Sequence, residues 1–167
     1  MAVTSDIMQT WRTPRQVMRK LLDQGRREDR AIVYLMVACV LIFVAQWPRL
    51  SRIAAGFEPS PWPVEINFEG MMTYTFYALV VMLPLAFYGL AAIARLVAML
   101  FGGHGSWYSA RLALFWTLLA TSPLLLLHGL ARGFVGPGVQ ANLVGFIWLA
   151  GFALLWFQSV LEAESSR

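Results

Sequence analysis

Four long apolar stretches, separated by turn-forming residues, constrain this chain more than any other feature. They cover residues 31–47, 71–100, 110–130 and 143–161, and the central turns of all four carry no formal charge. A run of roughly 20 mostly apolar residues matches a hydrocarbon core about 30 Å thick, whereas a helix of a soluble domain has a charged face. The sequence therefore predicts an all-α membrane protein, built as a bundle of four transmembrane helices.

Composition supports a lipid environment. Hydrophobic residues make up 59% of the chain and charged residues 13%, whereas about a quarter of an ordinary soluble chain is charged. The net charge is +4, but seven of the thirteen Lys and Arg residues lie in the first thirty positions. That placement favours anionic lipid headgroups as the partner of the basic residues and argues against nucleic acid. Cys39 is the one cysteine, so an internal disulfide is excluded.

The basic cluster before the first apolar stretch predicts the orientation. Positive charge is retained on the cytoplasmic side, so residues 1–30 should form a cytoplasmic amino-terminal segment. An even number of spans within the membrane domain, residues 31–161, then makes residues 162–167 a cytoplasmic tail. The lead-in is too long and polar for a signal peptide, which points to a retained first helix. Arg49 and Arg52, on the nominally outer side, argue against this orientation.

A short amphipathic helix is predicted ahead of the first span. Thr13 and Pro14 are typical of a helix start, and Gly25 is placed to end the helix. One of its faces is apolar and the others are basic, as in helices that lie in the headgroup plane. The alternative is a solvated lead-in whose arginines only set orientation. On the first interpretation, the residues that contact the membrane surface are Trp11, Arg15, Val17, Arg19, Lys20 and Leu21.

The second and third spans are predicted to form a kinked hairpin. Gly102, Gly103 and Gly105 allow the positive φ values of a tight reversal. Pro84 and Pro123 lie at equal sequence distances from the centre of that turn, so they should kink both helices at similar depth. Such paired kinks serve helix packing or mark a substrate site, and packing is favoured. Hydroxyl groups near enough to satisfy the carbonyls that the prolines free belong to Tyr88, Thr117, Thr121 and Ser122.

The segment 48–70 is expected to be an extended loop on the outer surface. Its prolines at positions 59, 61 and 63 forbid a continuous helix. Its aromatic residues, which include Phe57 and Trp62, are typical of a bilayer interface, although a partner protein could use the same side chains.

The sequence contains no catalytic, cofactor or metal constellation. His104 and His128 are predicted on opposite sides of the membrane, where they cannot share a metal. All carboxylates lie outside the four stretches, so the buried acidic relay of a proton-coupled transporter is missing. Arg95, near one end of the second stretch, has a stem long enough to reach the headgroups. These observations predict a protein that is not an enzyme.

Two segments resemble the bacterial branch of the Yip1 family. Residues 101–127, FGGHGSWYSARLALFWTLLATSPLLLL, contain a glycine-rich turn with a serine, followed by a span with a proline in its second half. The lead-in over residues 11–22 is similar to the proline-containing cytoplasmic segment of such proteins. The resemblance implies a polytopic, non-enzymatic protein of the bacterial inner membrane, whose eukaryotic relatives are linked to vesicle trafficking and small GTPases. Family members often have five spans, whereas four are counted here.

Two functions remain open from the sequence. The first is an accessory, scaffold or membrane-organising subunit that acts through helix packing and through contacts with lipid, other membrane proteins or itself. The alternative is a small permease or channel component that uses the hairpin kinked at Pro84 and Pro123. The absence of charge at the centre of the spans favours the first function.

Overall fold

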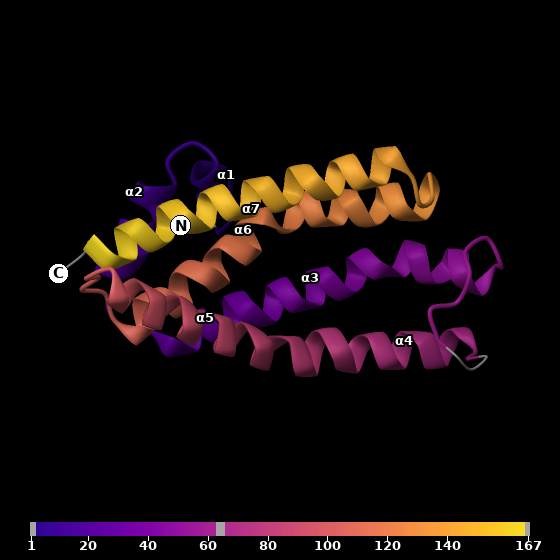
Figure 1. Ribbon diagram of the computed structural model, residues 1–167, viewed down its shortest axis with the longest axis horizontal. Coiled ribbons are helices and arrows are strands. Elements are labelled where there is room, and N and C mark those ends of the chain that lie inside the picture. The colour runs from indigo at the N-terminus through magenta and orange to yellow at the C-terminus, as the bar shows by residue number, and fades with distance from the viewer. Residues whose placement is uncertain (1–2, 63–65, 166–167) are drawn as a thin grey trace.

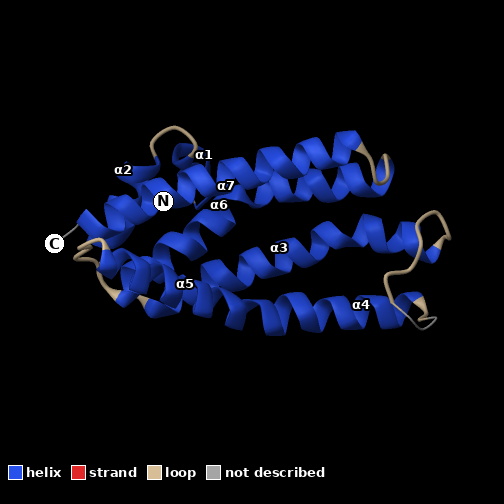
Figure 2. Ribbon diagram, viewed as in Figure 1, coloured by secondary structure: helices blue, strands red, loops and turns tan. Residues whose placement is uncertain are grey.

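The computed structural model describes residues 3–62 and 66–165, and this part of the chain is almost entirely helical. Four helices are long and apolar enough to cross a membrane, and the described residues contain no strand (Figure 2). The predicted all-α, four-span bundle is confirmed. In chain order the elements are α1 (Val3–Thr10), α2 (Pro14–Asp23), α3 (Glu28–Ala54), α4 (Phe68–Phe76), the π-helix η1 (Tyr77–Met82), α5 (Leu83–Leu100), α6 (Trp107–Phe134) and α7 (Val139–Ser165).

Two helices extend further than the sequence predicted. Helix α3 continues through Pro48 to Ala54, so the loop expected from residue 48 begins after that helix. Leu50 and Ile53 are buried there against Met71 of α4, and this packing offsets the backbone hydrogen bond that the proline removes. Helix α7 runs to Ser165, so the described part of the expected tail is helical. Residues 63–65, which include Pro63 and Glu65, lie outside the described residues.

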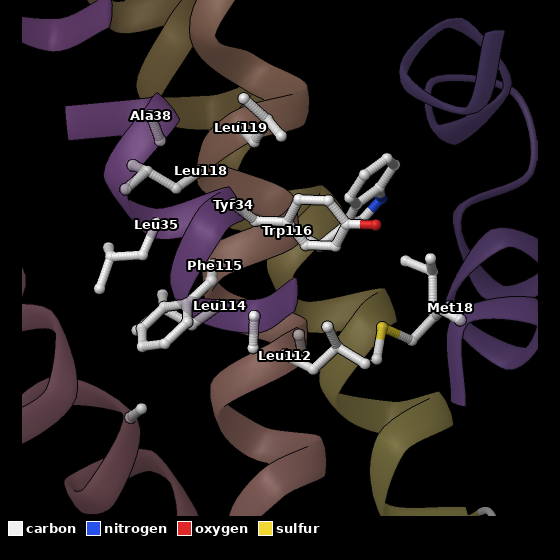
Figure 3. Packing of buried hydrophobic residues seen from close by; sticks show 14 of the residues in the cluster. Met18, Tyr34, Leu35, Ala38, Leu112, Leu114, Phe115, Trp116, Leu118 and Leu119 are labelled. Carbon is white, nitrogen blue, oxygen red and sulfur yellow. The ribbon is translucent and has the colours of Figure 1, made fainter. Parts of the chain in front are cut away.

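Helix α6 is the central element of the bundle and packs between α3 and α7 (Figure 1). Within its apolar window 67% of the residues are buried, compared with 6% in the span Phe68–Leu100 formed by α4, η1 and α5. Its Trp116 and Phe115 are the largest fully buried side chains (Figure 3). Tyr34 of α3 meets Trp116 edge-on with 5.0 Å between ring centres. The core therefore surrounds the first half of α6, and the second span leaves most of its surface outside that core.

Helices α3 and α6 approach each other closely enough to require glycine. A Cβ added at Gly129 would lie 2.1 Å from the carbonyl oxygen of Ala45, and one at Gly133 would lie 2.1 Å from Cβ of Pro48. Two small residues four positions apart lie on one face of a helix and let two backbones come together, which is how membrane helices maximise van der Waals contact. This pair of glycines was not among the residues predicted to pack helices together.

The two prolines are accommodated in different ways. The hydroxyl of Ser122 donates to the carbonyl of Leu119, the group that Pro123 leaves without its helical donor, at 2.8 Å. On the other side, the backbone widens into η1 directly before Pro84, and the Leu83 N–H bonds to the carbonyl of Ala78. The prediction that a nearby hydroxyl satisfies a freed carbonyl is confirmed for Ser122. It is wrong for Tyr88, whose ring packs against Phe115 and faces the Arg111 guanidinium.

Replacing Gly129 by Ala should destabilise the bundle, because the new methyl group overlaps the Ala45 backbone. The expected loss is about 1–3 kcal/mol, as for other overpacked cores. Gly89→Ala is the matched control, since nothing lies within 4 Å of a Cβ there, and it should be neutral or stabilise the helix by up to about 1 kcal/mol. Unfolding by SDS titration in mixed micelles measures both variants, and equal losses would contradict the close approach.

Candidate functional site

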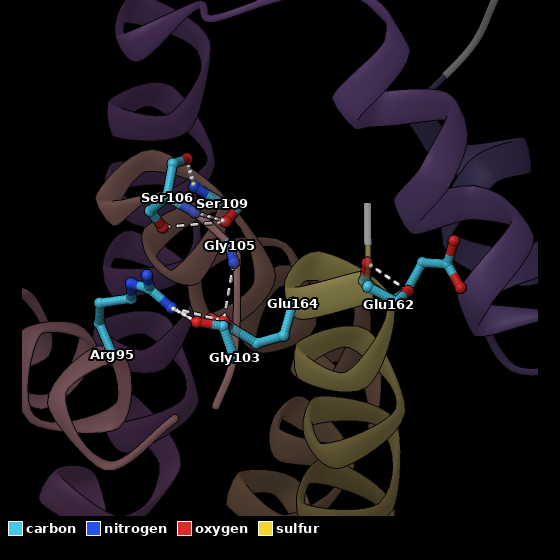
Figure 4. A network of polar contacts seen from close by, with 8 residues as sticks. Arg95, Gly103, Gly105, Ser106, Ser109, Glu162 and Glu164 are labelled. Carbon is cyan, nitrogen blue, oxygen red and sulfur yellow. Dashed lines mark hydrogen bonds and ion pairs between the residues drawn. The ribbon is translucent and has the colours of Figure 1, made fainter. Parts of the chain in front are cut away.

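Polar side chains converge at one end of the bundle, where α2, the α5–α6 turn and the end of α7 meet (Figure 1). The carboxylates that α7 carries at Glu162 and Glu164 are two residues apart, so they point about 200° apart around the helix. Figure 4 shows them leaving α7 in opposite directions. Glu164 reaches α5 and the turn, whereas Glu162 reaches α2. The end of α7 is therefore held from two sides.

Glu164 is the centre of a cluster that we call the Glu164 clasp, formed with Arg95, Gly103 and Gly105 (Figure 4). Arg95 donates to Oε2 of Glu164 at 2.5 Å, and the backbone N–H of Gly105 donates to the same oxygen at 2.9 Å. A longer contact of 3.4 Å joins the Arg95 guanidinium to the Gly103 carbonyl. One carboxylate thus connects α5, the turn and α7.

Arg95 is only 6% exposed, which corrects the expectation that its side chain reaches the headgroups. Extending to the headgroups would leave Glu164 buried without its counter-charge, and a buried unpaired charge is costly. Arg95 pairs with Glu164 instead of extending to water, because the core already holds α5 and α7, which carry these two residues, against α6.

The three glycines of the turn serve two different purposes. Gly102 has a φ of +78° and ends α5, as the sequence predicted from its freedom to adopt positive φ. Gly103 and Gly105 are needed for close approach instead. A Cβ at Gly103 would lie 2.3 Å from Oε2 of Glu164, and one at Gly105 would lie 2.7 Å from the carbonyl of Ala163. Ser106 then begins α6 with a reciprocal capping box to Ser109.

Helix α2 forms where it was predicted, but its apolar face lies in the protein core. Val17 and Leu21 are 1% and 4% exposed and belong to the cluster that contains Trp116 of α6. The expectation that these two side chains enter the membrane surface is therefore wrong. An amphipathic pattern identifies a buried face without saying whether protein or lipid covers it, and here α7 and the core cluster around Trp116 cover it.

The basic residues of α2 divide between ion pairs and exposed positions. Arg19 donates to Oε1 of Glu162 at 2.7 Å, and this hydrogen bond, with the attraction of the opposite charge, raises the pKa of the guanidinium above its usual value. Lys20 pairs with Asp6 of α1 at 2.6 Å. Arg15 is exposed, and 68% of the Arg19 side chain remains accessible. Contact of these basic groups with anionic headgroups stays a prediction.

Trp11 connects the amino-terminal segment to α6. Its indole N–H donates to the carbonyl of Ala120 at 3.1 Å, and its ring lies against Gly151 of α7. The neighbouring Thr10 accepts a hydrogen bond from the indole of Trp116 at 3.0 Å. With 40% of its surface exposed, Trp11 closes the edge of the core instead of lying free in the interface.

The two histidines take no part in this cluster. His104 is exposed in the turn, and His128 of α6 contacts the Ala141 carbonyl through Nδ1 at 3.0 Å. No group of three or more His, Cys, Asp or Glu side chains suited to a metal ion occurs within residues 3–62 and 66–165. The charged groups of the site hold helices together through charge-assisted hydrogen bonds.

The chain matches the model of the Yip1 domain over residues 8–167. It belongs to the Yip1 domain family. Comparisons with curated proteins and with solved structures give no match. The match therefore includes α2, the four spans and all members of the Glu164 clasp. With its four membrane-length helices, this chain is a multi-pass membrane protein of the Yip1 family.

The ion pairs that Glu162 and Glu164 form were not predicted from the sequence. Both residues closely follow the last apolar stretch, in the segment predicted as a cytoplasmic tail. The signal that pointed to a partner was Arg95, because a charge inside a membrane span is almost always paired. Sequence spacing alone did not identify the partner, since 69 positions separate Arg95 from Glu164.

Glu164→Gln should destabilise the bundle by about 3–5 kcal/mol, because it leaves the Arg95 guanidinium buried without a counter-charge. Replacing both partners by leucine should cost far less, since an apolar pair carries no desolvation penalty. Glu69→Gln, at an exposed carboxylate, is the control. Thermal unfolding in neutral detergent compares the three variants. If Glu164→Gln and Glu69→Gln unfold at the same temperature, the clasp does not hold the helices together.

Proposed function

We propose that this Yip1-family protein is a non-enzymatic accessory or scaffold subunit that organises other membrane components through helix packing and lipid or protein contacts. The observation that carries the proposal is an apolar groove of about 800 Å³ between α5 and α7. Ile93 and Phe157, on its two walls, are 60% and 63% exposed. The groove therefore offers a shaped apolar surface to another membrane component.

The Glu164 clasp supports this function because it fixes the walls of the groove. Helices α5 and α7 each pack on α6, and Gly103 and Glu164 line one end of the groove. The ion pair between Arg95 and Glu164 joins the two walls at that end. A surface held in place before binding loses little conformational entropy when a partner docks.

The surroundings of Pro123 favour a packing role for the kinks over a permease pathway. Thr121 and Ser122, near the proline, are both buried. Thr121 donates to the carbonyl of Thr117 at 3.0 Å, and Ser122 donates to that of Leu119. These hydroxyls satisfy the helix backbone, whereas a solute pathway needs polar groups that face water.

The ion pair between Arg19 and Glu162 supports an arrangement with both termini on the same side of the membrane. Because basic residues concentrate before the first span, we infer that this side is the cytoplasm and that the membrane is the bacterial inner membrane.

Thiol labelling in intact cells tests the orientation and the pathway together. Single cysteines are placed in a Cys39→Ala background at Gln24, Val135 and Ser122. Gln24 is exposed in the turn after α2, beside the start of α6, and Val135, which is 60% exposed, follows the end of α6. A membrane-impermeant maleimide should label position 135 in intact cells, position 24 only after lysis, and position 122 in neither case. Labelling at position 24 first would reverse the topology, and solute-blocked labelling at position 122 would favour a permease.

Site-specific photo-crosslinking tests the scaffold function. A photoreactive residue at Ile93, inside the groove, should give a discrete protein adduct in native membranes. The same residue at Leu85, which is 65% exposed but outside the groove, should give only lipid adducts. Ala98→Trp, which narrows the groove, should abolish the protein adduct. Lipid adducts alone at both positions would refute a docking role for the groove.

A further inference from the structure

Arginines at positions 49, 52 and 132 gather at the end of the bundle opposite the Glu164 clasp, and two of them meet the carboxylate of Glu58. Arg49 and Arg132 both donate to Oε1 of Glu58, at 3.0 and 3.3 Å, and Glu58 is buried. The third, Arg52, has no carboxylate partner within residues 3–62 and 66–165. The described part of the cluster therefore has an excess of positive charge, concentrated at Arg52.

The contacts of Arg52 leave its guanidinium incompletely satisfied. It donates to the Gly133 carbonyl at 3.4 Å, and its terminal carbon lies 5.6 Å from the ring centre of Phe57. Its Nε is buried and has no hydrogen-bond partner. A buried donor without an acceptor is costly, and the cost rises when the group is charged. Arg52 thus has donor capacity for an anion.

Arg52 also lines a pocket of about 530 Å³ at the level where α3 leaves its apolar stretch. Trp47, Phe57 and Phe134, which are 46%, 72% and 80% exposed, line the same pocket. Exposed aromatic rings next to arginine are typical of the headgroup layer of a bilayer. The pocket therefore combines a guanidinium with apolar walls.

We propose that this pocket binds the phosphodiester headgroup of an anionic phospholipid from the leaflet opposite the amino-terminal helices. The guanidinium fork matches two phosphate oxygens, and the aromatic walls cover the glycerol and the first methylene groups of the lipid. A membrane lipid is favoured over a free anion because a hydrated ion gains nothing from the aromatic walls. The site is separate from the groove between α5 and α7, so it does not depend on the scaffold function.

Arg49 and Arg132 have a different role in this arrangement. Both are engaged by Glu58, which fixes the loop after α3 against α6. Their positive charge raises the local electrostatic potential, but their guanidinium groups are bonded to Glu58 and do not bind the phosphate. A lipid partner also accounts for arginines at an end of the bundle where the orientation rule does not predict them.

Native mass spectrometry of the full chain in neutral detergent tests the site. Phosphatidylglycerol is titrated against phosphatidylcholine and diacylglycerol, and the first bound lipid is quantified. Phosphatidylglycerol should bind most tightly, and Arg52→Gln should weaken it by about tenfold or more, as expected for a lost charge-assisted hydrogen bond. Arg111→Gln, which removes one positive charge from an arginine paired with Glu28 at the opposite end of the bundle, is the charge-matched control and should bind as wild type does.

Two further measurements decide the remaining outcomes. Inorganic phosphate at the same concentration should not displace phosphatidylglycerol, and full displacement would identify a free-anion site and overturn the lipid assignment. Arg52→Lys keeps the charge but loses the fork, so its affinity should fall between those of wild type and Arg52→Gln. If Arg52→Gln does not fold, the affinity of Arg52→Lys decides the outcome alone. Wild-type affinity in Arg52→Lys, or in a folded Arg52→Gln, would refute the proposal.

Discussion

The burial of the first half of α6 is the constraint on which the rest of the structure depends. Helices already in lipid gain little from hydrophobic burial, so close van der Waals contact and internal hydrogen bonds must hold them together. Trp116 and Phe115 fill the space around α6, and Gly129 lets α3 approach the same helix. Helix α1 joins through the hydrogen bond between Trp116 and Thr10. Every other span is positioned by its contact with α6 or with α3.

The two ends of the bundle use charge in opposite ways. At the end with the Glu164 clasp, Arg19, Lys20 and Arg95 each pair with a carboxylate, and the Arg95 pair is largely shielded from water, which makes its Coulomb attraction strong. Exposed pairs such as Arg27 with Asp29 add little there. At the other end, Arg52 lacks a described carboxylate partner. The first end is built to fix helices in place, and the second has the character of an anion site.

The geometry of the spans fits the scaffold function that we propose. No group of side chains suited to a metal ion occurs within residues 3–62 and 66–165, and the hydroxyls of Thr117, Thr121 and Ser122 bond to the backbone of their own helix. Chemical specificity in such a protein comes from shape and from a few charges at the ends of helices. The groove between α5 and α7 supplies the shape, and its closed end is set by Glu164.

The sequence by itself determined the class of fold, because the length and apolarity of four stretches leave only membrane-spanning helices as a solution. It also located the turn at Gly102, the kinking prolines and the start of α2, since these depend on local backbone chemistry. Only the tertiary structure decided what covers each face. The apolar face that includes Val17 and Leu21 was predicted to contact the membrane surface, but the protein core covers it. Glu164 became the partner of Arg95 only when α7 returned to the α5–α6 turn. Periodicity records which face is apolar, whereas the identity of its neighbour depends on contacts between residues far apart in the chain.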